Sequence, residues 1–239
     1  MTTQIRSTFF SIAGVGKINE DSWDCQTLAD GTCIAIIADG VGGNYGGSIA
    51  SALAVKVAMA TLEINSAMPL DEVFSITARA IQERGNEDLI SNQMATTLSV
   101  CIFHIDGTVS VGHVGDSRVY QLRGNGIIQM TKDQTEVAAL VEAGILSREQ
   151  AKTYPRRSVL RSALTAKGRF DIFKTKFSVN IGDRIILLTD GIYRLITKTH
   201  LRNLSLQSKT IDDLSYILNH EIDKKNDDDA TCIFIEIGV

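Results

Sequence analysis

The chain has 239 residues, 44% of them hydrophobic, and a formal net charge of −4 at pH 7. This length and apolar content suit one compact domain over residues 1–239, and the mild acidic charge argues against a nucleic-acid binder. No stretch reaches the roughly 20 apolar residues of a membrane span, and the N-terminus lacks a signal peptide's apolar run. We therefore expect a cytoplasmic protein with no membrane partner.

The predicted elements, taken in chain order, begin with a strand at residues 32–39 followed by two helices. Residues 47–63 are apolar on more than one face, which is typical of a well-buried helix. Residues 70–90 follow a proline and carry acidic side chains in the first turn, where the helix dipole favours them. Three strands come next, at residues 97–105, 108–115 and 117–123. The dipeptide Asp106-Gly107 predicts a hairpin between the first two.

The second half of the chain begins with polar helices. Residues 134–154 predict two short helices with Gly144 as the stop between them. A strand at 183–190, a helix at 211–224 and a last strand at 230–237 complete the chain. The segment 131–162, which we call the flap, is predicted to be an insertion beside a site. Three of its arginines either attract phosphopeptide or acidic residues or simply face solvent, and they are Arg156, Arg157 and Arg161.

The order of these elements lacks the strict alternation of strand and helix that a doubly wound parallel sheet requires. It favours an α+β fold with two antiparallel sheets packed face to face and covered by helices, a four-layer α-β-β-α sandwich. The chain has four cysteines and no C-x-x-C pair. Three of them lie in apolar strand-like runs, so we expect buried free thiols rather than a disulfide or a zinc site.

Acidic residues recur where predicted strands begin or end. Asp39 ends the run CIAIIA and Asp190 ends the run RIILLT, and each is followed by glycine. Other acidic residues lie beside strand-like or turn segments, namely Glu20, Asp21, Asp116, Asp228 and Asp229. Each aspartate alone is equally well explained as a turn residue.

Several carboxylates gathered at one end of a sheet would repel each other strongly unless cations neutralised them. Oxygen-only ligands suit Mg²⁺, Mn²⁺ or Ca²⁺, and zinc is disfavoured because no His or Cys cluster has ligand spacing. The glycines after Asp39 and Asp190 allow backbone groups to approach a ligand closely.

An ordered set of motifs matches a known family over nearly the whole chain. The chain resembles the metal-dependent type 2C Ser/Thr protein phosphatases, particularly their short bacterial forms. The motifs are NEDS (19–22), ADGVGG (38–43), ATTLS (95–99), VGDSRVY (114–120), TKDQT (131–135), GDRIILLTDG (182–191) and DDAT (228–231).

The resemblance implies a central β-sandwich with metals in a cleft at one end. It implies that Asp39 bridges two Mg²⁺ or Mn²⁺ ions and that Asp190 and Asp228 complete the first metal site, so these three are the catalytic residues. The other implied ligands are Glu20 and the carbonyl of Gly40 for the second ion, with Asp21 close by, and Asp116 for a third, weaker site.

The implied reaction is the hydrolysis of phosphoserine and phosphothreonine in proteins that a Ser/Thr kinase has phosphorylated. A water bridging two cations has a lowered pKa and can attack phosphorus without a covalent phosphoenzyme. Because the chain is short, we expect a monomeric catalytic unit.

Two departures from the family pattern leave alternatives open. The family's phosphate-binding Arg, three residues before the Asn of its NED motif, is replaced by Gly16, with Lys17 next to it. We predict that Lys17, or an arginine elsewhere such as Arg6, takes over this role; the alternative is that Lys17 is merely a solvated side chain. The last motif is Asp228-Asp229 instead of Asp-Asn, so Asp229 could compete for metal.

The missing arginine motivates a second hypothesis, a catalytically impaired phosphatase-like binding module. A third hypothesis, an aspartyl-phosphate hydrolase, requires Asp-x-Asp at a strand end, which the segments after Asp39 and Asp190 lack.

Overall fold

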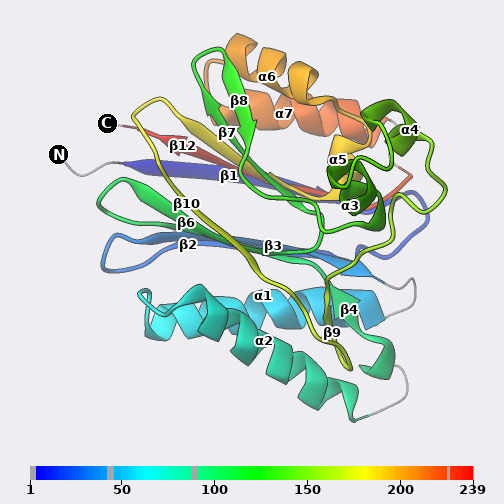
Figure 1. Ribbon diagram of the computed structural model, residues 1–239. Coiled ribbons are helices and arrows are strands. Elements are labelled where there is room, and N and C mark those ends of the chain that lie inside the picture. The colour runs from blue at the N-terminus through cyan, green and yellow to red at the C-terminus, as the bar shows by residue number, and fades with distance from the viewer. Residues whose placement is uncertain (1–3, 42–45, 88–90, 225–226, 239) are drawn as a thin grey trace.

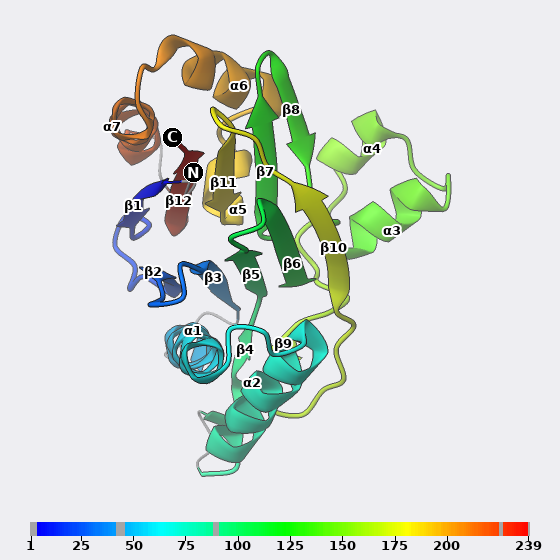
Figure 2. The same ribbon diagram turned by 90° about the vertical axis from the view of Figure 1, so that its left-hand side faces the viewer.

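The structure is a computed structural model that describes residues 4–41, 46–87, 91–224 and 227–238. Two antiparallel sheets pack face to face, and helices cover the outer face of each (Figure 1). Viewed from the side, the four predicted layers follow one another as helices, sheet, sheet and helices (Figure 2). The sequence-based expectation of an α-β-β-α sandwich is therefore confirmed.

The first sheet has the strand order β1-β12-β11-β7-β8, and the second has the order β10-β6-β5-β3-β4-β9, with β2 paired to β3. The strands are β1 (Ile5–Ile12), β2 (Asp21–Thr27), β3 (Cys33–Val41), β4 (Ala95–Thr96), β5 (Leu98–Phe103), β6 (Thr108–Val114), β7 (Arg118–Arg123), β8 (Gly126–Gln129), β9 (Leu164–Thr165), β10 (Phe173–Ser178), β11 (Arg184–Leu188) and β12 (Ala230–Ile237).

The helices are α1 (Gly46–Ile64), α2 (Leu70–Gly85), the short 3₁₀ helix η1 (Ser91–Gln93), α3 (Glu136–Glu142), α4 (Arg148–Lys152), α5 (Asp190–Tyr193), α6 (Lys198–Gln207) and α7 (Ile211–Asp223). The helices α1 and α2 cover the second sheet, and α6 and α7 cover the first (Figure 2).

Strand β3 explains why the central strands are apolar without a break. Its alternate residues Ile34 and Ile36 pack toward α1 and α2, while Ala35 and Ile37 pack between the two sheets. Because successive side chains of a strand point to opposite faces, a strand covered on both faces must be apolar throughout. β12 follows the same rule, with Phe234 under α6 and α7 and Ile233 between the sheets.

Helix α1 is long and apolar enough to cross a membrane by length and composition alone. It packs on the second sheet beside α2, and half of its apolar window is buried there. The same composition is typical of a core helix in a sandwich, where neighbouring layers cover more than one face of the helix.

The predicted strands and long helices are all present, and most of their bounds agree within two residues. The hairpin prediction is also confirmed, because Gly107 adopts a φ of 78° between β5 and β6. Helix α2 ends at Gly85, earlier than predicted, and residues 88–90 lie outside the described part of the chain, as do residues 42–43 of the ADGVGG motif.

Several elements were missed by the sequence analysis. Strand β2 reads DSWDCQT, which is too polar to resemble a strand, and it pairs only with β3. β10 alternates exposed and half-buried residues at the edge of its sheet. The helix α6 was missed because its residues are mostly polar. It is capped by Thr197, whose side chain accepts a hydrogen bond from the backbone N–H of His200.

The two short helices predicted in the flap are confirmed as α3 and α4. α3 ends at Glu142 with Ala143 as its C-cap, and Gly144 follows with a φ of 71°, the left-handed conformation that commonly ends a helix. Three of the four cysteines are buried free thiols, as expected, and Cys25 is half-buried.

Candidate metal centre

Four aspartates from both sheets reach the same end of the sandwich. Asp21 begins β2 and lies opposite Asp39 of β3 in the antiparallel register. Asp190 follows β11, and Asp228 precedes β12, the antiparallel neighbour of β11. Because antiparallel neighbours place the end of one strand beside the start of the next, each sheet contributes one pair.

The two sheets are joined at this end by a hydrogen bond from Thr189 to Asp21. The hydroxyl of Thr189, directly before Asp190, donates to Oδ2 of Asp21 at 2.8 Å. The same hydroxyl accepts the backbone N–H of Thr231 at 3.0 Å. Asp21, Asp39, Asp190 and Asp228 therefore lie at the same end of the fold, and their role as ligands stays a prediction.

Burial and mutual repulsion raise the pKa values of three of these carboxyl groups, those of Asp21, Asp39 and Asp190. The pKa of Asp39 lies well above its usual range because of desolvation first and then the charges of Asp21, Asp190, Asp116 and Asp228. Desolvation likewise raises the pKa of Asp21 and of Asp190 to about 7. Carboxylates this close repel each other when ionised, and a bound cation would offset that repulsion.

Asp21 supplies a further sign that this end of the fold suits a cation. Its Oδ1 is buried and has no hydrogen-bond partner in the described part of the chain. A buried carboxylate oxygen without a donor is costly, and a hard cation is a partner that such an oxygen prefers. The donors gathered here are all oxygen atoms, so the residues present fit Mg²⁺ or Mn²⁺.

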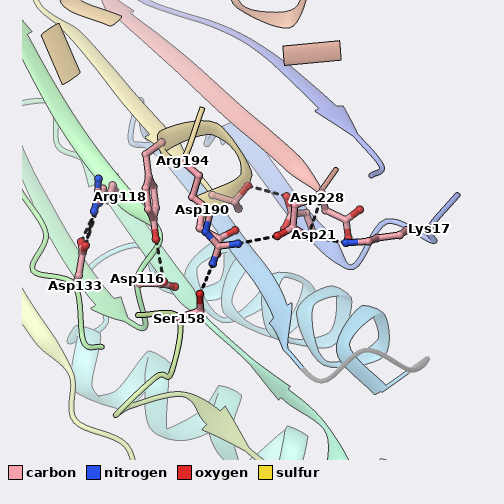
Figure 3. Close-up of polar contacts among 12 residues, drawn as sticks. Lys17, Asp21, Asp116, Arg118, Asp133, Ser158, Asp190, Arg194 and Asp228 are labelled. Atoms are coloured by element: carbon pink, nitrogen blue, oxygen red, sulfur yellow. Dashed lines mark hydrogen bonds and ion pairs between the residues drawn. The ribbon is translucent and has the colours of Figure 1, made fainter. Parts of the chain in front are cut away.

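Arg194 is the cation closest to these carboxylates, and the sequence analysis missed it. It follows α5 and forms ion pairs with Asp190 and with Asp228, the latter at 2.9 Å from Nη1 to Oδ2. Its Nη2 also donates to Oγ of Ser158 in the flap at 3.1 Å (Figure 3). No three His, Cys, Asp or Glu side chains of residues 4–41, 46–87, 91–224 and 227–238 form a group arranged to hold one ion.

The backbone of Asp39 is fixed by the ATTLS motif, whose role the sequence did not reveal. The Thr97 hydroxyl accepts the backbone N–H of Asp39 at 2.9 Å, and the carbonyl of Asp39 accepts the backbone N–H of Thr97 at 2.9 Å. The hydroxyl of Thr96 donates to the same carbonyl at 3.0 Å. These bonds hold Asp39 where β3 passes from β5 to β4.

Asp229 has a structural role. Its two carboxylate oxygens accept the backbone N–H groups of Gly14 and Glu20 at 2.8 and 2.7 Å. Both oxygens are therefore engaged in holding the β1–β2 connection. Asp229 thereby fixes the position of the Glu20 backbone, and its competition for metal stays a prediction.

Glu20 and Gly40 meet the start of α1. The carbonyl of Glu20 accepts the backbone N–H of Gly40 at 3.1 Å. A Cβ on Gly47 would lie 2.7 Å from Oε1 of Glu20, and a Cβ on Gly40 would lie 2.4 Å from the carbonyl oxygen of Gly47. Both glycines are thus required by the close approach of the chain segments that hold the Glu20 carboxylate.

Asp116 lies after β6 and is held by a residue that the sequence analysis also missed. The hydroxyl of Tyr193 donates to its Oδ2 at 2.9 Å, and burial raises the pKa of Asp116. The guanidinium of Arg118 stacks on the Tyr193 ring at 3.6 Å and pairs with Asp133 (Figure 3). Tyr193 and Arg194 both belong to the turn after Asp190.

His113 is a structural residue, as predicted. Its Nε2 lies 2.9 Å from the carbonyl oxygen of Gly115, and its Nδ1 lies 2.8 Å from Oγ of Ser99. Because a carbonyl only accepts, Nε2 carries the proton and Nδ1 accepts from the serine. Desolvation lowers the pKa of His113 to about 4, so the ring is neutral and fixes the turn before Asp116.

Lys17 reaches the site from the β1–β2 connection, whereas Arg6 does not. Nζ of Lys17 lies 3.2 Å from Oδ1 of Asp228. Arg6 pairs with Asp212 of α7 at the opposite end of β1. It is six residues from Ile12, roughly 20 Å along an extended strand, so Arg6 is ruled out as the substitute for the missing arginine.

The four-layer fold and the acidic end of the sandwich define the class of metal-dependent protein phosphatases. A family model described as protein phosphatase 2C matches residues 11–226. The chain therefore belongs to the protein phosphatase 2C family of serine/threonine phosphatases.

Relatives of known name agree with this assignment. The chain is 28% identical over 230 residues to the serine/threonine phosphatase stp of Listeria monocytogenes, covering 91% of this chain and 90% of that protein. It is 31% identical over 196 residues to the protein phosphatase PhpP of Streptococcus pneumoniae, covering 78% of each. The catalytic domain of the phosphatase PstP, solved with two manganese ions, superposes with a TM-score of 0.85 at 25% identity over 100% of both chains.

Proposed function

We propose that this protein hydrolyses phosphoserine and phosphothreonine in cytoplasmic proteins, acting as a monomer with a water that two Mg²⁺ or Mn²⁺ ions activate. The observation that carries this proposal is the gathering of Asp21, Asp39, Asp190 and Asp228 at one end of the sandwich. Family membership and the two manganese ions of PstP support the same reading.

The proposed ligands are the residues that the family resemblance implies. Asp39 would be held in common by the two ions, and its carboxyl group is close enough to Asp21, Asp190, Asp116 and Asp228 for their charges to raise its pKa. Asp190 and Asp228 would hold one ion with it, and Glu20 with the carbonyl of Gly40 would hold the other. Asp21 would contribute from beside Asp39, and Asp116, with Asp190, would hold a third ion more weakly.

When bound, the cations would lower the pKa of a water and offset charge on the phosphoryl oxygens. The chain's own contribution is to hold the ligands before substrate arrives. Thr96 and Thr97 fix Asp39, and Asp229 fixes Glu20. Tyr193 orients Asp116. Such prior organisation is how a site avoids reorganising at the moment of reaction.

Lys17 is our proposed contact for the substrate phosphate. Its side chain is half-exposed, and its amine lies beside Asp228 at the open edge of the site. Hydrogen bonding to Asp228 raises the pKa of Lys17, so the amine is fully charged near neutral pH. A lysine presents a point charge and lacks the guanidinium fork, which makes its contact with phosphate less specific in direction.

The proposal is tested by measuring phosphate release from a phosphothreonine peptide. We expect turnover with Mn²⁺ or Mg²⁺, loss of turnover with a chelator, and recovery when metal is restored. Peptide binding without turnover would support the binding-module hypothesis instead, and a trapped phosphoenzyme would support the aspartyl-phosphate hypothesis. The Lys17→Ala variant in the same assay should raise KM several-fold with little change in kcat, whereas Lys56→Ala on the exposed face of α1 should change neither. An unchanged KM would remove Lys17 from the site.

A further inference from the structure

A cleft of about 830 Å³ lies between the flap and the strands β7 and β8. It opens directly onto the proposed metal centre, because Asp116, Tyr193 and Arg194 line both. The helices α3 and α4 form its other wall, and they project beside the first sheet (Figure 2). A substrate whose phosphate lies at the metal centre can therefore place its neighbouring residues in this cleft.

The wall formed by α3 and α4 is apolar and incompletely packed. Val137, Ala138 and Val141 of α3 and Ala151 of α4 line the cleft, and each is only half-buried. Neither helix has a buried residue. An apolar surface next to a catalytic centre can contact the backbone of an extended peptide and the aliphatic parts of its side chains.

Some of the basic side chains around this apolar wall form ion pairs, and others do not. Lys152 pairs with Glu149, and Arg118 pairs with Asp133. Lys132 pairs with Glu142. Arg148 and Arg157 also line the cleft and are exposed, and neither has an ion-pair partner within the described ranges of the chain.

Arg156, which is adjacent to Arg157 in the flap, has an ion-pair partner. Arg156 pairs with Glu136, whose carboxylate also accepts the hydroxyl of Tyr154 at 2.6 Å. This cluster ties the loop after α4 to the start of α3. Arg157 is adjacent in sequence to Ser158, which accepts a hydrogen bond from Arg194 at the metal centre. Arg157 thus lines the cleft next to the residue that contacts Arg194.

We propose that this cleft binds the substrate segment next to the phosphorylated residue and selects segments with acidic side chains, through Arg148 and Arg157. The apolar wall of α3 contacts the segment, and the two guanidinium groups pair with its carboxylates. A guanidinium presents two parallel N–H donors to a carboxylate, which is a specific and directional contact. This proposal rests on the proposed function, because it names the class of protein substrate for the same site.

The test compares two phosphothreonine peptides that differ only in their flanking residues, acidic in one and alanine in the other. We expect wild type to show a kcat/KM about fivefold to tenfold higher for the acidic peptide, the effect of two exposed ion pairs. The double variant Arg148→Gln/Arg157→Gln should bring the ratio close to one. It should leave the turnover of p-nitrophenyl phosphate, which is too small to fill the cleft, unchanged.

A matched control removes two exposed arginines elsewhere. Arg6→Gln/Arg79→Gln changes the net charge equally on β1 and α2, and it should keep the wild-type preference. Higher salt should reduce the preference of wild type, because exposed pairs are screened. Equal kcat/KM values for both peptides with wild type, or a preference that survives the double variant, would overturn the proposal.

If the proposed function is wrong, the protein will hydrolyse neither peptide, nor p-nitrophenyl phosphate, in the presence of Mn²⁺. This outcome differs from those that test the cleft. Fluorescence anisotropy with the same two labelled peptides would then test the cleft directly. Tighter binding of the acidic peptide that the double variant abolishes would support the cleft, and equal binding of both would refute it.

Discussion

The Asp39→Asn variant is expected to lose catalysis almost completely while keeping its fold. Asn is close to Asp in size but is neutral and a weaker ligand for hard cations. If Asp39 joins both ions, its loss should reduce kcat/KM by about a thousandfold or more, the scale at which removing a metal's support affects a hydrolase. Phosphate release from a phosphothreonine peptide measures the effect.

The same substitution is expected to preserve or increase the stability of the protein without metal. The pKa of Asp39 is raised in the folded protein by desolvation and by neighbouring carboxylates. Its ionised form near neutral pH therefore disfavours the fold, and that cost grows as pH rises above the usual range of an aspartate. The variant should be as stable as wild type or more stable in chelator, and it should gain less from added Mn²⁺.

Thermal unfolding with and without Mn²⁺ checks this second part. Asp24→Asn is a suitable control because Asp24 lies on the same strand, β2, that carries Asp21, and it hydrogen-bonds Gln26. It should retain both activity and the stabilisation by Mn²⁺. An Asp39→Asn variant that remained active would refute the bridging role, and one that failed to fold in chelator would contradict the electrostatic argument.

The Gly191→Ala variant is expected to show a large loss of stability. A Cβ at this position would lie 2.0 Å from the carbonyl oxygen of Asp229, far inside any tolerated contact. The overlap involves backbone, so the turn after β11 must move away from the segment before β12. We expect a cost of about 3 kcal/mol, which corresponds to a fall in Tm of about 6–12 °C for a chain of this size.

The displacement of this turn should reduce activity by more than the loss of stability accounts for. Gly191 follows Asp190, and Asp229 follows Asp228, so the collision separates two proposed ligands. Activity measured well below Tm should fall by at least tenfold. Gly126→Ala is a matched control in the exposed strand β8, where the added Cβ would lie 3.3 Å from the carbonyl oxygen of Arg123. A Gly191→Ala variant with wild-type Tm and activity would contradict the close approach.

The sequence predicted the layers of the fold because its central strands carry a clear physical signal. β3 and β12 are covered on both faces, so they are unbroken apolar runs. β2 escaped prediction because most of its residues are polar and its only strand partner in the described sheets is β3. Its position depends on partners far along the chain, and no local pattern encodes them.

Some residues of the candidate site were likewise predictable from the sequence, and others were not. The acidic residues were found because they lie where apolar runs begin or end, a feature visible in the sequence. Tyr193 and Arg194 were missed because their partners, Asp116 and Ser158, are distant in sequence and meet them only in the fold. The signal that could have pointed to them was their position in the turn directly after Asp190. The structural role of Asp229 likewise depends on two backbone N–H groups from the other end of the chain.

The most direct measurement is anomalous scattering from crystals of this protein grown with Mn²⁺. We expect two strong peaks at the end of the sandwich, with the carboxylate of Asp39 in contact with both and those of Asp190 and Asp228 on one of them. Manganese peaks found elsewhere, or a single ion that Asp39 does not touch, would contradict the central claim that these distant carboxylates form one binuclear site.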